Sequence, residues 1–581
     1  MKIGDKIDPL KTIKFIYEIA INKFCKQTPM KIEAIPYDLK KNKYLHMKKI
    51  LSVFILCVFA FANAQTELVF VFFKDKPNKA AFYANPLSEL TQKSLDRRMR
   101  LGVALNDQDA PIEPSYIQNI RNLGFTVTDY SKWMNGVAVN ATAAEIVQLE
   151  SQAYVESVES FIKHSNRSAK PQKRVNKFEE FNNSLGKTDF NYGTGLAQIN
   201  QINLRPLHVA GYTGSGITIA VIDTGFPRVN TGSAYARIRN NGQIKGGYNF
   251  INKSTDIYNT SLNNHGSYCL GTIAGYVENS FVGSAPDADF YLYATEDGAN
   301  EIPEELIYWT EAAEEADRKG VDVISTSLGY YSFDDPRYDL TYSDMNGTTS
   351  FIARTAQIAA EKGIFVLFAA GNEAQNSWHY IITPSDNEKV FTIGGVTASG
   401  ASSSFSSYGP NSVGVIKPDA SARGTNTAMG YNNGATTNSG TSFATPLAAG
   451  GVACLLQAMP TKPLEEVKDL LRKSASLYPN HTDPMGYGIL NFSEALTDAQ
   501  LATANENVKS KITVYPNPVK STFTISTAEK IVSVELYDAL GRKVQTLSNT
   551  ALNNIEKAGK GTYFVKIKTD KNEFIEKIIK Q

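Results

Sequence analysis

Residues 217–222, with the sequence Ile-Thr-Ile-Ala-Val-Ile, form a short and almost entirely apolar run. Similar runs lie at 321–326 (Val-Asp-Val-Ile-Ser-Thr) and 364–370 (Ile-Phe-Val-Leu-Phe-Ala-Ala), and helix-like segments separate the three. Short strands without polar alternation are typical of a parallel sheet that is buried on both faces. The sequence therefore predicts an α/β domain with a doubly wound, mostly parallel sheet, which we assign to 188–497.

The composition excludes several classes of protein. The chain has 581 residues, of which 42% are hydrophobic and 20% charged, so a folded multidomain protein is expected rather than a disordered one. Its 59 Lys and Arg against 58 Asp and Glu give a net charge of +1, which argues against electrostatic capture of nucleic acid or of an anionic membrane. Four scattered cysteines, Cys25, Cys57, Cys269 and Cys454, are too few for a disulfide framework or a zinc cluster.

Residues 50–62 are apolar enough for a membrane-spanning segment, but this run is shorter than the roughly 20 residues needed to span a bilayer. A basic start at Met47-Lys48-Lys49 precedes them, and a small-x-small cleavage site lies at Ala62-Asn63-Ala64. These three parts together predict a secretory signal peptide over 47–64. Because signal peptides begin a chain, we expect translation to start at Met47 and interpret 1–46 as an over-extended N-terminus.

Residues 65–162 alternate strand-like and helix-like segments, including a helix expected over 86–100 and a strand expected over 125–127. This pattern predicts a small α+β domain. Residues 163–177 then carry six basic and no acidic side chains. We therefore expect 163–187 to be an exposed linker and a site of proteolytic cleavage.

The C-terminal part of the chain has a different pattern. A polar linker is expected over 498–510. From 511 to 581, short runs alternate apolar and polar residues, with turn residues between them. This alternation predicts an all-β, sandwich-like module.

Four polar residues stand where predicted strands end or helices begin. Asp223 closes the first apolar run, Asn372 follows a later one, and His265 and Ser442 each open a helix. A serine nucleophile needs an adjacent base, which histidine provides, and a buried carboxylate holds the imidazole in the right tautomer. An Asn amide and the N–H groups at a helix start are donors for a tetrahedral oxyanion. Together these residues have the parts of an acyl-transfer site.

Some of these residues also admit other interpretations. The Asp-Thr-Gly at 223–225 occurs in aspartic peptidases too, but those need two such loops and the sequence has no second one. Cys269, four residues after His265, is either a thiol nucleophile or, as is usual for a cysteine, a small buried hydrophobe. Whether Cys269 pairs with Cys454 is left open.

His379 and His481 lie outside any motif, and we expect them to be ordinary surface or core residues. An acidic insert offers oxygen ligands for calcium, but its spacing matches no ligand loop, so a solvated loop is favoured. Its acidic residues are Asp334, Asp335, Asp339 and Asp344.

Four motifs resemble the signatures of the subtilisin-like serine peptidases, or subtilases. They are Asp223-Thr-Gly, His265-Gly, Asn372 within Ala-Ala-Gly-Asn-Glu, and Gly440-Thr-Ser442-Phe-Ala-Thr-Pro446. The order Asp, His, Ser along the chain is that of subtilisin. One departure is Tyr268, where the family often has a second histidine. We expect altered packing there rather than lost catalysis.

The resemblance implies a role for each motif residue. Asp223 would orient His265, the general base and then acid, and Ser442 would be the acylating nucleophile. Asn372 and the backbone N–H of Ser442 would form the oxyanion hole. A backbone segment would pair with the extended peptide as an added β-strand, and a carboxylate would lie near the rim of the pocket for the residue before the cleaved bond. These substrate-binding residues are Ser327, Leu328 and Gly329 for the backbone pairing, and Glu373 for the rim.

The flanking domains carry further resemblances. Residues 65–162 are similar to the subtilase pro-domain, an intramolecular chaperone and inhibitor, in the segments 135–139 and 155–159. The C-terminal end of such a domain would lie in the substrate cleft as a product-like strand, and would be cut near the basic linker.

Residues 511–581 resemble the C-terminal sorting domain of type IX secretion substrates, in the segments 514–518, 536–542 and 561–567. That resemblance implies a Gram-negative host, export across both membranes, and removal of the tail on release or anchoring. The alternative is a β-sandwich that binds carbohydrate or protein, in which case the tail would stay on the extracellular protein.

Together these observations predict a secreted or cell-surface serine endopeptidase of a Gram-negative bacterium, made as an auto-inhibited zymogen, that hydrolyses peptide bonds through an acyl-enzyme on Ser442. Its partners would be protein or peptide substrates, its own pro-domain as an intramolecular inhibitor, and the outer-membrane secretion machinery, but no nucleic acid. No cofactor is expected to be required, although the resemblance implies that structural calcium can bind, as it does in many subtilases. The alternative is a non-catalytic cell-surface adhesin or scaffold on a subtilase fold.

Overall fold

The computed structural model describes residues 65–163, 191–508, 512–527, 529–539, 542–570 and 573–581. The expected over-extended N-terminus and signal peptide lie outside these ranges. All but the first residue of the linker 163–187, where cleavage is expected, lies outside them too.

A seven-stranded sheet lies at the centre of the largest domain. Its strand order is β13-β12-β11-β10-β5-β9-β6, and every pair of neighbours is parallel. The prediction of a doubly wound parallel sheet is therefore confirmed. The strands are β5 (Thr218–Asp223), β6 (Ile244–Asn249), β9 (Asp289–Ala294), β10 (Val323–Thr326), β11 (Phe365–Ala369), β12 (Phe391–Val396) and β13 (Ala420–Arg423).

Successive side chains of one strand belong to two different cores. In β5, Ile219 and Val221 pack into one apolar cluster, while Ala220 and Ile222 pack into the other. All four are essentially inaccessible to solvent. Because side chains alternate across a sheet, a strand with no polar residue needs a hydrophobic layer on each side. This is why the uninterrupted apolar runs of the sequence lie at the centre of the domain.

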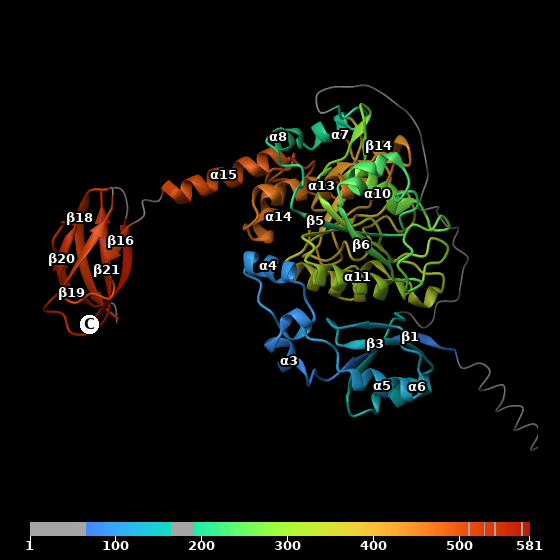
Figure 1. Ribbon diagram of the computed structural model, residues 1–581, viewed down its shortest axis with the longest axis horizontal. Helices are drawn as coiled ribbons and strands as arrows, with labels where there is room; N and C mark the ends of the chain where they lie inside the picture. The colour runs from blue at the N-terminus through green and yellow to red at the C-terminus, as the bar shows by residue number, and fades with distance from the viewer. Residues whose placement is uncertain (1–64, 164–190, 509–511, 528, 540–541, 571–572) are drawn as a thin grey trace, which may run out of the picture. The chain divides into compact units, whose positions relative to one another are not determined.

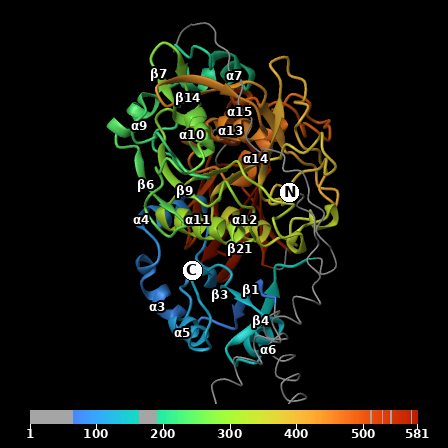
Figure 2. The same cartoon turned by 90° about the vertical axis from the view of Figure 1, so that its right-hand side faces the viewer.

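Helices supply those two layers, as Figure 1 shows for α10 and α13 on one face and α11 on the other. The helices α11 and α12 lie side by side on the second face (Figure 2). The first layer consists of α7 (Leu196–Gln201), α8 (Arg205–Val209), α9 (Ala236–Asn240), α10 (His265–Ala274), α13 (Thr441–Ala458), α14 (Leu464–Lys473) and α15 (Phe492–Val508), and the second of α11 (Glu305–Lys319) and α12 (Phe351–Glu361). Two hairpins complete the domain: β7 (Tyr276–Val277) with β8 (Phe281–Val282), and β14 (Thr427–Tyr431) with β15 (Gly434–Asn438).

The N-terminal domain contains a four-stranded antiparallel sheet of order β2-β3-β1-β4. On β1, Val69 and Val71 point into the domain's own core, whereas Leu68 and Phe70 pack against residues of α11 and α12. The ring of Phe70 lies 4.8 Å from that of Phe351. The elements are β1 (Glu67–Phe73), α3 (Lys79–Ala84), α4 (Gln92–Leu101), α5 (Pro114–Asn122), β2 (Asp129–Ser131), β3 (Gly136–Ala141), α6 (Ala143–Glu150) and β4 (Val155–Ser160).

Two expectations for this domain are wrong. The helix expected over 86–100 begins only at Gln92, because Thr91 caps it by accepting from the backbone N–H of Ser94. The strand expected over 125–127 is absent there. Phe125 and Val127 are buried in the core, but the hydrogen-bonded strand comes later, at β2. Apolar alternation in this segment indicates burial and not strand pairing.

The C-terminal module has a three-stranded sheet of order β16-β17-β20 and a four-stranded sheet of order β19-β18-β21-β22 around a single apolar cluster. The sandwich-like prediction is confirmed. The segment expected as a linker over 498–510 is helical through Val508, as the end of α15. The strands are β16 (Thr513–Tyr515), β17 (Thr522–Ser526), β18 (Ile531–Asp538), β19 (Lys543–Leu547), β20 (Leu552–Asn554), β21 (Gly561–Thr569) and β22 (Glu573–Lys580).

Candidate active site

Asp223 and His265 come from neighbouring elements, the last residue of β5 and the first of α10. Asp223 Oδ1 lies 2.7 Å from His265 Nδ1 and also accepts from the backbone N–H of Thr224 at 2.8 Å. Asp223 is fully buried and His265 is 2% exposed. A carboxylate that accepts from Nδ1 fixes the tautomer, so that Nε2 is the basic nitrogen.

A glycine makes this approach of helix to strand possible. A Cβ on Gly266 would lie 2.4 Å from the carbonyl oxygen of Gly225 and 2.9 Å from Asp223 Cβ, so no larger residue fits after His265. The side chain of Asn263 accepts from the backbone N–H of His265, the first residue of α10, at 2.9 Å. The local sequence thus fixes the imidazole against the end of β5.

Ser442, the second residue of α13, shares its surroundings with His265. The ring of Phe443 lies 5.5 Å from the imidazole, and Cys269 Sγ lies 3.4 Å from the Ser442 carbonyl oxygen and 3.8 Å from His265 Nδ1. The Ser442 hydroxyl donates to the carbonyl of Ser327 at 3.2 Å, and Ser327 Oγ donates to the carbonyl of Ser442 at 2.7 Å. The nucleophile candidate is therefore held against the segment that follows β10.

Asn372 follows β11 and faces the start of α13. Its Oδ1 accepts from the backbone N–H of Thr441 at 2.9 Å and from Thr441 Oγ1 at 3.0 Å. Because Thr441 holds the side-chain oxygen of Asn372, the side-chain nitrogen of Asn372 points toward Gly440 and can act as a donor. A Cβ on Gly440 would lie 3.6 Å from Asn372 Nδ2. This donor and the N–H groups at the helix start suit an oxyanion.

The substrate-binding candidates lie at the ends of the same strands. Ser327, Leu328 and Gly329 directly follow β10 and are buried. Glu373 follows Asn372 and accepts from Tyr331 Oη at 3.1 Å. The structure thus brings the four acyl-transfer candidates and these residues to the carboxyl ends of β5, β10 and β11, where open α/β sheets carry their sites.

Further residues of this edge are not apparent from the sequence. Asn376 also donates to Glu373, and the ring of Trp378 stacks on that of Tyr331 at 4.5 Å. Ile382 lies between two glycines, since a Cβ on Gly329 would be 2.6 Å from Ile382 Cδ1 and one on Gly371 would be 3.2 Å from it. The available signal is the cluster of aromatic residues Trp378-His-Tyr, but nothing in the sequence places Trp378 beside Tyr331.

Cys269 and Cys454 are both buried free thiols, so they do not pair with each other. Burial, with Asp223 nearby, raises the pKa of the Cys269 thiol well above its ordinary value. A thiol held in its neutral form is a poor nucleophile, which disfavours the thiol-protease interpretation. Tyr268 packs on Tyr431 at a ring distance of 4.3 Å, in line with altered packing at this position.

The remaining histidines and acids have local contacts. His379 Nδ1 lies 2.9 Å from the carbonyl oxygen of Ala374, and the His481 ring lies 6.0 Å from that of Tyr487. In the acidic insert, each carboxylate accepts a hydrogen bond from a nearby residue; the pairs are Asp334 with Glu301, Asp335 with Arg337, Asp339 with Phe333, and Asp344 with Thr341.

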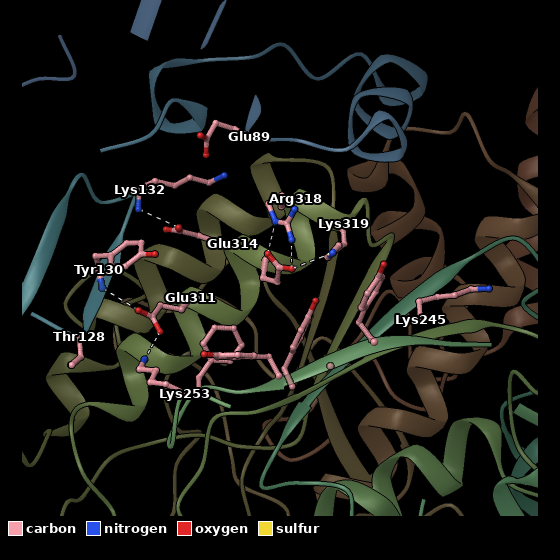
Figure 3. A pocket seen from close by; sticks show the side chains of 17 residues that line it. Glu89, Thr128, Tyr130, Lys132, Lys245, Lys253, Glu311, Glu314, Arg318 and Lys319 are labelled. Carbon is pink, nitrogen blue, oxygen red and sulfur yellow. Dashed lines mark hydrogen bonds and ion pairs between the residues drawn. The ribbon is translucent and has the colours of Figure 1, made fainter. Parts of the chain in front are cut away.

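A cavity of about 720 Å³ lies apart from this edge, between β2 and the catalytic domain, with side chains from both around it (Figure 3). Glu311 accepts from the backbone N–H of Tyr130 at 3.1 Å and pairs with Lys253 at 2.8 Å. Burial raises the pKa of Glu311 to about 7. No acyl-transfer candidate lines the cavity, which is a feature of the contact between the two domains.

Comparison with known families matches three parts of the chain. Residues 214–495 match the subtilase family, residues 68–177 match the Peptidase S8 propeptide domain of Bacteroidota, and residues 513–581 match the secretion system C-terminal sorting domain. These three assignments confirm the resemblances drawn from the motifs.

Individual relatives agree. The chain is 31% identical over 306 residues to serine protease AprX of Bacillus subtilis, which covers 48% of this chain and 64% of AprX. It is 31% identical to subtilisin E of the same species, in an alignment that covers 51% of this chain and 70% of subtilisin E. It is 30% identical to the subtilisin of Bacillus pumilus, in an alignment that covers 51% of this chain and 97% of that subtilisin. The crystal structure of the epidermin leader peptide processing serine protease (EpiP) from Staphylococcus aureus shares the fold, with a TM-score of 0.51 and 16% identity over 75% of this chain and 99% of that one.

Proposed function

The chain belongs to the subtilase family, and on that premise we propose that it cleaves peptide bonds as an endopeptidase through an acyl-enzyme on Ser442. It is a zymogen with a subtilase propeptide, and its sorting domain makes it a secreted or cell-surface protein of a Gram-negative bacterium. The observation that carries the catalytic proposal is the 2.7 Å contact of buried Asp223 with His265, whose imidazole lies 5.5 Å from the ring of Phe443, the residue after Ser442.

In the first step, Ser442 Oγ attacks the carbonyl carbon of the peptide bond. His265 Nε2 takes the hydroxyl proton as the new C–O bond forms, and the carbonyl π electrons move onto oxygen. Asp223 stabilises the imidazolium without accepting its proton. In the resting protein the hydroxyl donates to Ser327, so it must turn toward the imidazole before attack.

The tetrahedral oxyanion is stabilised by donors that exist before the reaction begins. The Asn372 amide nitrogen is available because Thr441 holds the amide oxygen from two sides. The backbone N–H of Ser442, in the first turn of α13, is the second donor. Preorganised donors stabilise the developing charge without a cost of reorganisation in the transition state.

Collapse of this intermediate breaks the C–N bond. The leaving amine takes the proton from His265 and departs, and the acyl group stays on Ser442 as an ester. A water molecule then gives a proton to His265 as it attacks the ester carbon. The second collapse returns that proton to Ser442 Oγ and releases the carboxylic acid.

Substrate binding uses the segment after β10. We assign Ser327, Leu328 and Gly329 to backbone pairing with an extended peptide, and Glu373 to the rim of the pocket beside Tyr331. No step of this mechanism needs a cofactor. A structural calcium ion would find a suitable ligand set in the buried or half-buried carboxylates of Glu296, Glu301 and Glu305, whose ligand atoms lie within 4.8 Å of one another.

The domain boundaries follow from the same proposal. We assign 47–64 to the signal peptide, 65–162 to the inhibitory pro-domain, 163–187 to the segment that is cut, and 511–581 to the module that engages the outer-membrane secretion machinery. Substrates are proteins or peptides. The function of a non-catalytic adhesin does not require the contact between Asp223 and His265, which prepares the imidazole to accept a proton. We therefore prefer the endopeptidase.

A fluorophosphonate reagent tests the proposal, because it forms a covalent bond with an activated serine. One equivalent is expected to add to the processed protein and to map to Ser442, with loss of peptide hydrolysis. The Ser442→Ala and Asp223→Asn variants should show no label and a strongly reduced label, respectively. Hydrolysis that persists in Ser442→Ala, or a folded wild-type protein that neither takes the label nor cuts peptide, would overturn the proposal.

A further inference from the structure

Cys269 lies one turn of α10 after His265, and both side chains are buried. Residues four apart on a helix share a face, and Cys269 Sγ lies 3.8 Å from His265 Nδ1. This is the ring nitrogen that faces Asp223, not the nitrogen that acts as the base. No step of the proposed mechanism uses the thiol. A thiol, an imidazole and a carboxylate therefore meet behind the catalytic nitrogen.

Asp223 has one oxygen left for a further partner. Its Oδ1 lies beside His265 Nδ1 and accepts from the backbone N–H of Thr224. Its Oδ2 has no hydrogen-bond partner among the residues that the structure describes, although Asp223 is fully buried. A buried carboxylate oxygen without a donor is costly in free energy. A cation bound at this point offsets that cost.

The three side chains supply the donor atoms of a zinc site. One ligand atom from each of Asp223, His265 and Cys269 lies within 4.8 Å of the other two. Thiolate sulfur, imidazole nitrogen and carboxylate oxygen are the donors that zinc prefers, whereas calcium and magnesium prefer oxygen alone. The sulfur and nitrogen ligands of a tetrahedral zinc ion lie about 3.6 Å apart, close to the 3.8 Å between the thiol and the imidazole.

The carboxylate needs only a small movement to join them. The nitrogen and oxygen ligands of a tetrahedral zinc ion lie about 3.3 Å apart. Asp223 Oδ1 lies 2.7 Å from His265 Nδ1, because a proton and not a metal ion now stands between the two atoms. A bound ion would therefore push the carboxylate away from the ring by about 0.6 Å.

The second thiol of the catalytic domain lacks a third ligand. Cys454 is also fully buried, and its Sγ lies 3.6 Å from His208 Nε2. Among the described residues, no carboxylate completes a group of three there within the same 4.8 Å. The two pairs of cysteine and imidazole differ in the carboxylate that Asp223 supplies, so Cys454 provides a matched control.

We propose that Asp223, His265 Nδ1 and Cys269 form an inhibitory site for a thiophilic divalent cation of the zinc type, with the fourth position taken by water. An ion bound there switches the catalytic centre off, and removal of the ion switches it on again. The effect on hydrolysis rests on the proposed function, whereas binding of the ion does not.

The chemistry of binding explains the inhibition. The ion forms a bond to Cys269 Sγ, and the thiol proton leaves to solvent. It forms a second bond to His265 Nδ1, and the proton of that nitrogen is then carried by Nε2, so the imidazole stays neutral. The net release is one proton per ion, and nothing is oxidised or reduced. Because Nε2 now holds a proton, it cannot accept one from Ser442.

The test compares the processed wild type with its Cys269→Ser and Cys454→Ser variants. Serine keeps nearly the size of cysteine but provides no thiolate. Peptide hydrolysis is titrated with zinc, and each protein is compared with its own rate without metal. Cadmium is then added, because a cadmium thiolate has an ultraviolet charge-transfer band that can be measured without any activity.

Zinc should inhibit the wild type and Cys454→Ser at the same concentration, a chelator should restore both, and calcium at that concentration should not inhibit. Cys269→Ser should need at least about a hundredfold more zinc, since loss of a group that only orients a ligand already costs about 10- to 100-fold in metal affinity. Cys269→Ser should also lack the cadmium band, which Cys454→Ser should keep. Inhibition of Cys269→Ser at the wild-type zinc concentration would overturn the proposal, as would a band that depends on Cys454.

A further measurement separates the site from the proposed function. If the wild type does not hydrolyse peptide, the proposed function fails, and the site is judged in Ser442→Ala with the linker cut by an added protease. This protein should still show the cadmium band, and calorimetry in two buffers should find one proton released per ion. A Ser442→Ala protein without the band would contradict the site itself.

Discussion

The hydroxyl of Ser442 donates to the carbonyl of Ser327, and the hydroxyl of Ser327 donates back to the carbonyl of Ser442. This reciprocal pair joins the start of α13, which carries the nucleophile, to the segment that follows β10. Ser327 therefore holds Ser442 in place through two hydrogen bonds, one to its hydroxyl and one to its carbonyl. Under the proposed function, an extended peptide that pairs with Ser327 would compete for this carbonyl, and the Ser442 hydroxyl would then turn toward His265.

Ser327→Ala tests this relationship. The variant removes the hydroxyl bond to Ser442 but keeps the backbone carbonyl, so the loss is that of one hydrogen bond, about 1 kcal/mol. We expect kcat to fall about fivefold with little change in KM. Ser325→Ala, on β10 and equally buried, is the control and should keep wild-type kcat. A change confined to KM would instead indicate that Ser327 acts only on the substrate.

Asn372→Ala should remove an oxyanion donor. In subtilisin itself, loss of the equivalent donor costs about 10²–10³ in kcat, and we expect the same range here with KM nearly unchanged. Asn376→Ala removes an amide that contacts Glu373 instead, and should leave kcat within a few-fold of the wild type. Equal effects of the two substitutions on kcat would contradict the assignment of Asn372.

Ile382 should limit the side chain accepted before the cleaved bond. It fills the space between Gly329 of the substrate segment and Gly371, which precedes Asn372. The wild type should therefore prefer small residues at this substrate position, and Ile382→Gly should raise kcat/KM for phenylalanine relative to alanine by about tenfold or more. A peptide library with one varied position measures the ratio. An unchanged ratio would show that the pocket lies elsewhere.

The contact between the domains should weaken as pH rises. Burial raises the pKa of Glu311 to about 7 from an ordinary 4.5, and Tyr130 and Lys132 of the pro-domain contribute to that burial (Figure 3). The charged groups around it are Lys253, Asp129, Lys132 and Glu314. A pKa raised in the complex gives stability that is present below pH 4.5 and is lost as pH rises through 7.

Release of the cut pro-domain, measured by gel filtration, should therefore accelerate at least about tenfold between pH 5 and pH 7.5, since each unit of displaced pKa is worth about 1.4 kcal/mol and the displacement exceeds one unit. Glu311→Gln removes the titrating group and should flatten this part of the pH profile. Glu315→Gln, on the same helix but paired with Arg318, is the control. A profile that is as steep in Glu311→Gln as in the wild type would rule out Glu311 as its source.

The edge of the sheet at which the site candidates meet could be predicted from the sequence, because two of these residues directly follow predicted strands. Asp223 and Asn372 each follow an apolar run, and parallel strands bring their carboxyl ends to one edge whatever their separation along the chain. The predicted parallel sheet was therefore enough to bring these candidates together with His265 and Ser442.

Contacts between distant side chains could not be predicted in this way. Arg97 and Asp317 lie 220 residues apart and belong to different domains, and no periodicity relates them. Ile382 and Tyr331 belong to loops whose paths depend on packing. The strand expected over 125–127 was wrong for a related reason, since apolar spacing reports which residues are buried and not which backbone groups are paired.

The most direct test of the account is the intact mass of the purified chain beside that of its Ser442→Ala variant after folding. The wild type is expected to lose the segment ahead of the catalytic domain, by a cut within 163–187, and the variant is expected to keep it. A folded wild type that keeps the segment, or a variant that loses it at the same bond without an added protease, would contradict a working Ser442 nucleophile.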